Sequence, residues 1–159
     1  MATPSLYERL GGVYSIATVV DDFIDRIMID PRLNANPRVD EVHHRVPPAG
    51  FKYLVTEMVC WTTGGPQKYT GRSMKDSHKD LMITAAEWEA FLDDLQQTLD
   101  KFAVPEAEQA EIKAIVNSTR AEQVPSFFSE CLLIATVPGS DSGGKGLRLH
   151  GVPEAVNGW

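Results

Sequence analysis

The sequence predicts an all-α fold, and two observations support this class. Apolar residues recur at three- and four-residue steps along several segments, which is the spacing of one buried face on an α-helix. Residues that cap helices begin these segments, and glycine or proline ends them. No convincing strand pattern precedes Pro125. Crossed helices that bury their apolar faces against one another, as in an αα sandwich, are therefore expected.

Two helices are expected near the N-terminus. A short one spans about residues 5–10, and Gly11-Gly12 separates it from a helix of about four turns that Pro31 helps to end. The apolar face of this longer helix comprises Val13, Ile16, Ala17, Val20, Phe23, Ile24, Ile27 and Met28. Residues 30–46 contain turn-forming asparagines and prolines without any period, so this segment is expected to be irregular.

Three further long helices are expected before Pro125. Pro47-Pro48 suits the first turn of one helix, and Gly64-Gly65-Pro66 ends it. Thr84 and Glu87 form a capping box at the start of the next, in which each side chain satisfies a free backbone donor of the other residue. Pro105 opens the last of these helices.

The composition changes at Pro125 and divides the chain into two expected regions. Residues 1–124 are expected to form the helical domain. Residues 125–159 hold six of the twelve glycines and are expected to be a glycine- and proline-containing extension of unknown structure.

Composition and charge exclude several classes of protein. A length of 159 residues suffices for one domain with a substantial core. A net charge of −7 argues against a surface for nucleic acid or anionic membranes. No apolar stretch is long enough to cross a bilayer, and no signal peptide is visible. Cys60 and Cys131 form no CxxC motif, which suits a reducing compartment, so a cytoplasmic location is expected.

His78 is the candidate metal ligand. It lies in a short helical stretch between two longer helices, and Ser73 with Asp76 is a plausible cap for that stretch. Four-coordinate zinc would need several more His or Cys ligands, and the chain has only three other histidines and two isolated cysteines. Haem needs one axial protein ligand, because the macrocycle supplies four nitrogens. The chain lacks the CxxCH motif of covalent attachment, so a haem would be held non-covalently.

Several motifs resemble those of the truncated haemoglobins, most closely group I. The matching pieces are residues 6–12 (LYERLGG), Phe23, residues 64–72 (GGPQKYTGR) and residues 73–81 (SMKDSHKDL). The resemblance extends from Ser5 to about Val124. It implies a truncated globin fold, which is a two-over-two helical sandwich around haem b, with His78 as the proximal iron ligand.

The chain departs from the family pattern on the distal side of the haem. Many members carry a tyrosine where this chain has Ile24. Distal-helix positions that often carry glutamine or another polar residue correspond to Phe51 and Val55, and a common Phe-Phe pair corresponds to Asn36-Pro37. The resemblance therefore implies an apolar distal pocket in this chain.

The candidate haem-binding residues are mostly apolar, and an ordinary helical core would also explain them. Lys52 and Tyr69 are candidates for the haem propionates, because carboxylates favour cations and phenols at a pocket rim. Met74 lies one helical turn before His78 and is expected to pack on the porphyrin. The full set is Phe23, Ile24, Phe51, Lys52, Val55, Met58, Tyr69, Met74, His78, Phe91, Leu95, Ile112, Ile115 and Val116.

Other polar side chains suggest structural roles. His43 and His44 are expected to be a solvated loop pair, with a sixth iron ligand as the alternative. Asp93 and Asp94 are expected on a solvated helix face rather than as a carboxylate pair for acid–base chemistry. Cys60 is expected to be a small buried hydrophobe.

The leading functional hypothesis is a haem-b protein that reversibly binds O2, CO or NO, as in oxygen binding or transport. The alternative is NO dioxygenation or other haem redox catalysis. That chemistry would need an external reductase as partner, because no flavin- or nicotinamide-binding segment is present. A third hypothesis is a haem-free helical interaction module in which His78 is structural.

Overall fold

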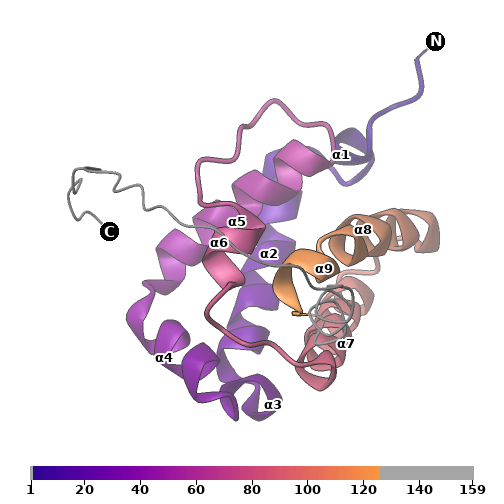
Figure 1. Cartoon of the computed structure of the whole chain (residues 1–159). Helices are drawn as coiled ribbons and strands as arrows, with labels where there is room; N and C mark the ends of the chain where they lie inside the picture. Colours follow the sequence, from indigo (N-terminus) through magenta and orange to yellow (C-terminus); the bar gives the residue numbers. More distant parts are fainter. Residues whose placement is uncertain (1, 126–159) are drawn as a thin grey trace, which may run out of the picture. The chain divides into compact units, whose positions relative to one another are not determined.

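The structure, a computed structural model, describes residues 2–125, which form helices without any strand and confirm the all-α prediction (Figure 1). The long helices are α2 (Gly12–Ile29), α5 (Pro48–Thr62), α7 (Ala85–Lys101) and α8 (Glu106–Ser118). The short helices are α1 (Leu6–Arg9), α3 (Pro31–Asn34), α4 (Pro37–Arg45), α6 (Met74–His78) and α9 (Arg120–Gln123). None of these helices is long and apolar enough to span a membrane. The extension predicted for residues 125–159 lies, beyond Pro125, outside the described residues.

Residues 30–46 form the short helices α3 and α4, so the expectation of an irregular segment was wrong. Asp30 accepts a hydrogen bond from the Arg32 N–H at 2.8 Å, and Asn36 accepts one from the Arg38 N–H at 3.0 Å. Each of these N-cap residues is followed by a proline at the first helical position. A capping oxygen and a proline start a helix without any apolar period, which is why periodicity missed both helices.

Helix α2 is the centre of the apolar core, and it packs against α5 and α7. Ile24 of α2 and Cys60 of α5 are both fully buried, as expected for apolar core positions. Phe23 meets Phe91 of α7 edge-to-face with ring centroids 5.3 Å apart, and Phe91 stacks on Trp88 at 5.4 Å. Burying one such side chain contributes about 1.5–3 kcal/mol, so these contacts anchor α7 on α2.

Two glycine pairs, Gly11-Gly12 and Gly64-Gly65, meet at Tyr7. The Tyr7 hydroxyl accepts a hydrogen bond from the Val13 N–H at 3.1 Å, directly after Gly11 and Gly12. These two glycines have φ values of 86° and 75°, in the left-handed region that side chains disfavour. On the other side of the ring, a Cβ atom at Gly65 would lie 2.6 Å from Tyr7. The paired motifs therefore join α1 to the start of α2 and to the end of α5.

Asp94 is buried between α3 and α7, so its predicted place on a solvated helix face was wrong. An Arg32 nitrogen (Nη2) lies 2.8 Å from Asp30 and 3.4 Å from Asp94, and the other (Nη1) lies 2.9 Å from Asp93. Burial and the adjacent Asp30 carboxyl raise the pKa of Asp94 to about 6. Asp93 remains half exposed, at 50% for its side chain.

Replacing Gly65 with alanine should destabilise the protein. The new Cβ atom would lie 2.6 Å from the Tyr7 ring and 2.8 Å from the Cys60 carbonyl oxygen, which is backbone and cannot move aside. We expect Gly65→Ala to lower the free energy of unfolding by about 1–3 kcal/mol in urea denaturation. The matched control is Gly50→Ala in α5, where nothing lies within 4 Å of the new atom, and a gain of about 0.5–1 kcal/mol is expected. Equal stability of the two variants would contradict the prediction.

Asp94→Asn should stabilise the protein in a pH-dependent way. The pKa of Asp94 lies above its ordinary value of 3.8, so the fold favours the protonated carboxyl and loses that contribution as pH rises through about 6. An amide resembles the protonated form, so we expect a gain of about 1–3 kcal/mol at pH 8 that shrinks towards pH 4. Urea midpoints between pH 4 and 8 would measure it. The exposed neighbour, as Asp93→Asn, is the control; a pH-independent gain for Asp94→Asn would count against the assignment.

Candidate functional site

His78 is the last residue of α6, and the local hydrogen bonds orient its ring. The Ser73 hydroxyl accepts a hydrogen bond from the Asp76 N–H at 3.1 Å, which confirms the predicted cap of α6. The Nδ1 atom of His78 lies 2.8 Å from the carbonyl oxygen of Met74, which can only accept, so Nδ1 carries the proton and donates it. The lone pair of Nε2 is then available for a metal, because a ligating histidine uses one nitrogen while the other donates.

Burial favours the form of His78 that can ligate a metal. Desolvation lowers the pKa of the half-buried His78 ring, so the neutral imidazole dominates near pH 7. Within residues 2–125, no group of three or more His, Cys, Asp or Glu side chains is arranged to hold a metal ion. A single oriented imidazole fits haem, which needs one axial protein ligand, better than it fits a protein-built zinc site.

The apolar candidates fall into three groups in the structure. Three are buried within the core, namely Phe23, Ile24 and Leu95. Five are half-buried and pack against that core, namely Phe51, Val55, Phe91, Ile112 and Val116. The remaining three, Met58, Met74 and Ile115, are half-buried. Half-buried apolar side chains on α5, α6, α7 and α8 offer the surface that a porphyrin needs, so the residues present fit the cofactor.

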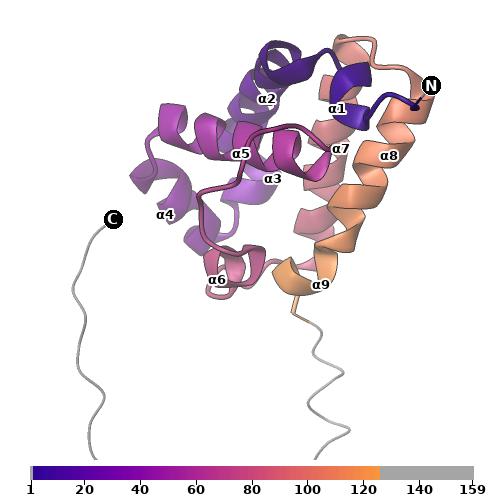
Figure 2. The same ribbon diagram turned by 90° about the horizontal axis from the view of Figure 1, so that it is seen from above.

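Helix α6 is supported by neighbouring helices. It lies between α4 and α9 in both ribbon views, and it contacts α9 (Figure 1, Figure 2). The Gln123 amide of α9 reaches the Met74 sulfur at 3.8 Å, a weak contact beside the carbonyl that orients His78. The short α6 is thus supported from outside its own five residues.

The two polar candidates already have partners in the protein. The Lys52 ammonium lies 2.7 Å from both Asp21 and Asp25 of α2. The Tyr69 hydroxyl donates to the Arg72 carbonyl oxygen at 2.8 Å. Both contacts favour structural roles, and a role for either residue at the haem propionates stays a prediction.

His43 and His44 lie in helix α4 rather than in a loop, so that part of the expectation was wrong. The Nδ1 atom of His43 lies 2.7 Å from the Asn34 side-chain oxygen, and that of His44 lies 2.8 Å from the Asp40 carbonyl oxygen. His43 is half-buried, which lowers its pKa. These contacts orient both rings within the α3–α4 segment.

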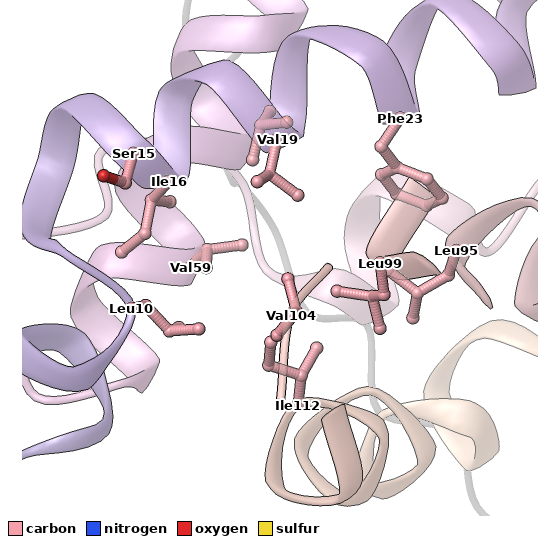
Figure 3. A pocket seen from close by; sticks show the side chains of 11 residues that line it. Leu10, Ser15, Ile16, Val19, Phe23, Val59, Leu95, Leu99, Val104 and Ile112 are labelled. Atoms are coloured by element: carbon pink, nitrogen blue, oxygen red, sulfur yellow. The ribbon is translucent and has the colours of Figure 1, made fainter. Parts of the chain in front are cut away.

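An apolar cavity of about 80 Å³ lies between α2, α5, α7 and α8 (Figure 3). Three predicted site residues, Phe23, Leu95 and Ile112, line it together with other apolar side chains and Ser15. Apolar cavities of this kind hold small apolar molecules rather than water. The motif-based reasoning missed the cavity, although the apolar period of α2 already placed Ile16 and Val20 on the buried face.

The family model that matches this chain is that of the bacterial-like globins, over residues 5–124. The chain belongs to this family. The globin is 31% identical over 119 residues to a group 1 truncated hemoglobin of Synechocystis, an alignment that covers 72% of this chain and 90% of that protein. It is 23% identical over 120 residues to a group 1 truncated hemoglobin of Tetrahymena pyriformis, covering 76% and 94% of the two chains.

Solved structures show the same fold. The truncated hemoglobin of Tetrahymena pyriformis in its Fe(III) form matches with a TM-score of 0.66 at 23% identity, covering 77% of this globin and 100% of that chain. A 2/2 hemoglobin of Synechococcus, in the cyanomet state with covalently attached heme, matches with the same TM-score and coverage at 26% identity. These likenesses confirm the predicted two-over-two truncated globin fold.

Removing the imidazole tests the assignment of His78. We expect His78→Ala to lose tight haem retention, or its five-coordinate ferrous spectrum. The reason is that α6 contains no other histidine that could bind the iron in its place. Haem titration of the apoprotein and the ferrous absorption spectrum would measure this. His44→Ala, at an exposed histidine of α4, is the control and should behave like the wild type. An unchanged titration and spectrum in His78→Ala would refute the assignment.

Proposed function

We propose that this globin binds haem b non-covalently through His78 and uses it to bind a diatomic gas (O2, CO or NO) reversibly. Membership in the globin family supports haem-based gas binding in general. The observation that carries the finer proposal is the hydrogen bond between His78 Nδ1 and the Met74 carbonyl, which leaves Nε2 available for iron. A bound haem, held by His78, would supply an iron atom able to bind a diatomic gas.

The chain's own residues have three tasks in this proposal. His78 binds the iron, and the Met74 carbonyl orients the ring and raises its basicity by accepting a hydrogen bond from Nδ1–H. Half-buried Phe51 and Val55 cover the cofactor and exclude water. The apolar cavity beside Phe23 provides space for a small apolar ligand.

The distal side is proposed to lack a hydrogen-bond donor. Ile24 is fully buried and apolar, and Phe51 and Val55 offer no donor either. Tyr53, a phenol on the same helix, is 62% exposed, and its hydroxyl is hydrogen-bonded to Glu57. Without a donor, O2, whose bound form is polarised, would gain little affinity relative to CO, whose bound form carries little charge. NO dioxygenation remains the alternative activity, and NO turnover with an added external reductase would identify it.

The absorption spectrum of the purified protein is the first test of the proposal. A Soret band that appears on haem addition, with CO binding after reduction, is expected. A protein that neither retains haem nor binds CO would be a haem-free helical module instead.

Introducing a donor on α5 tests the apolar distal side. Val55→Gln should slow O2 dissociation by about fivefold, since one hydrogen bond is worth about 1 kcal/mol, while CO dissociation should change less. Val55→Leu, which is larger but carries no donor, is the matched control. Stopped-flow dissociation rates of both gases would measure the effect. Equal O2 rates in the two variants would show that residue 55 points away from the ligand or that another donor already serves it.

A further inference from the structure

The side chain of Asn36 connects the start of α4 to the segment that follows His78. Its amide nitrogen Nδ2 donates to the Leu81 carbonyl oxygen at 2.9 Å and to a Glu87 carboxylate oxygen at 3.2 Å. Glu87 belongs to the capping box that starts α7. Asn36 therefore spans the connection between α6 and α7, touching it at both ends. We call Asn36, Leu81 and Glu87 the α4 staple.

The α4 staple reaches His78 through one further hydrogen bond. The Leu81 N–H donates to the His78 carbonyl oxygen at 3.0 Å. Both backbone groups of Leu81 are thus engaged, the oxygen by Asn36 and the nitrogen by His78. A parallel contact joins the two segments, since Arg38 donates to the Asp80 carbonyl oxygen at 2.8 Å.

The segment after His78 needs such support. Helix α6 has five residues, and a helix of that length is not stable by itself. Met82, directly after Leu81, has a φ of 53°, in the left-handed region that a residue with a side chain disfavours. Strained conformations persist only where the surroundings over-determine them, and the α4 staple supplies that restraint at the preceding carbonyl.

Asn36 has a second, separable role. Its side-chain oxygen Oδ1 accepts the Arg38 N–H at 3.0 Å and caps α4, whereas its nitrogen Nδ2 makes the α4 staple. An N-cap alone needs only an oxygen, which serine and aspartate also provide. The amide donor is therefore in excess of what the cap requires.

We propose that Asn36 is a positioning residue for His78, which holds the Leu81 carbonyl and thereby orients the imidazole relative to the haem iron. This inference rests on the proposed function, in which His78 ligates that iron. Without the amide donor, the Leu81 carbonyl loses its hydrogen bond to Asn36, and the C-terminal end of α6 is less firmly held. The imidazole then samples a wider range of orientations, while the rest of the core is unaffected.

The test compares substitutions that keep the cap and remove the donor. Asn36→Ser retains a capping hydroxyl that is too short to reach Leu81, and Asn36→Asp retains a capping oxygen that cannot donate. The control is Asn34→Ser, which removes an equally half-buried asparagine whose amide donates to the Met28 carbonyl at 2.9 Å and not to the segment after His78. The readouts are the iron–histidine stretching band of the ferrous haem protein by resonance Raman spectroscopy, and the thermal midpoint.

We expect both Asn36 variants to shift or broaden the iron–histidine band at unchanged haem content, and Asn34→Ser to leave it as in the wild type. Arg38→Ala should move it less, in the same direction. If Asn36→Ser fails to fold, Asn36→Asp decides the question. A band unchanged in the folded Asn36 variants, or moved equally by Asn34→Ser, overturns the inference. A wild type without an iron–histidine band, or a band that persists in His78→Ala, instead overturns the proposed function and the inference with it.

Discussion

The hydrogen bond between His78 Nδ1 and the Met74 carbonyl oxygen, 2.8 Å long, is the interaction on which the proposed site depends. It joins residues four apart, so it exists in this form only while α6 is helical. The five residues of α6 are too few to be stable alone, and they are held at both ends. Ser73 caps the start, and the Leu81 N–H binds the His78 carbonyl at the end. The orientation of one ring thus depends on contacts well outside its own helix.

The sequence predicted the long helices better than the short ones, for a physical reason. Helices such as α2 and α7 are stabilised by burying one face, which leaves a period in the sequence. Helices α3 and α4 are short and mostly polar. Their N-cap residues, Asp30 and Asn36, are each followed by proline, a pattern that is equally typical of a turn. Missing α3 also concealed the partners of Asp94, because the burial of that carboxyl arises from Arg32 and Asp30, about sixty residues earlier in the chain.

For the candidate site, too, local sequence patterns were informative, whereas contacts between residues distant in sequence were not. His78 could be singled out as the candidate ligand because the chain offers few alternatives and its surrounding motif is specific, and the apolar candidates followed from helical periods; their roles at a haem stay predictions. The contacts of Lys52 were not predictable, since a long side chain can reach several neighbours, and its partners Asp21 and Asp25 depend on how α5 packs on α2. The contact between Asn36 and Leu81 joins residues 45 positions apart, and nothing local to either one indicates it.

The proposed site has a polar side, where hydrogen bonds orient His78, and an apolar side, where the gas would bind. Buried polar groups need hydrogen-bond partners. Around α6, the side chains of His78 and Asn36 donate to the backbone carbonyls of Met74 and Leu81, and these contacts hold the side chains in place. Ile24, Phe51 and Val55, the residues proposed for the other side, offer no hydrogen-bond donor to a ligand. If the proposed site lacks a distal hydrogen bond, the properties of a bound iron would depend mainly on the orientation and basicity of the His78 imidazole. In the proposed function, the hydrogen bonds that hold His78, from the Met74 carbonyl to the α4 staple, would therefore set the affinity for a gas.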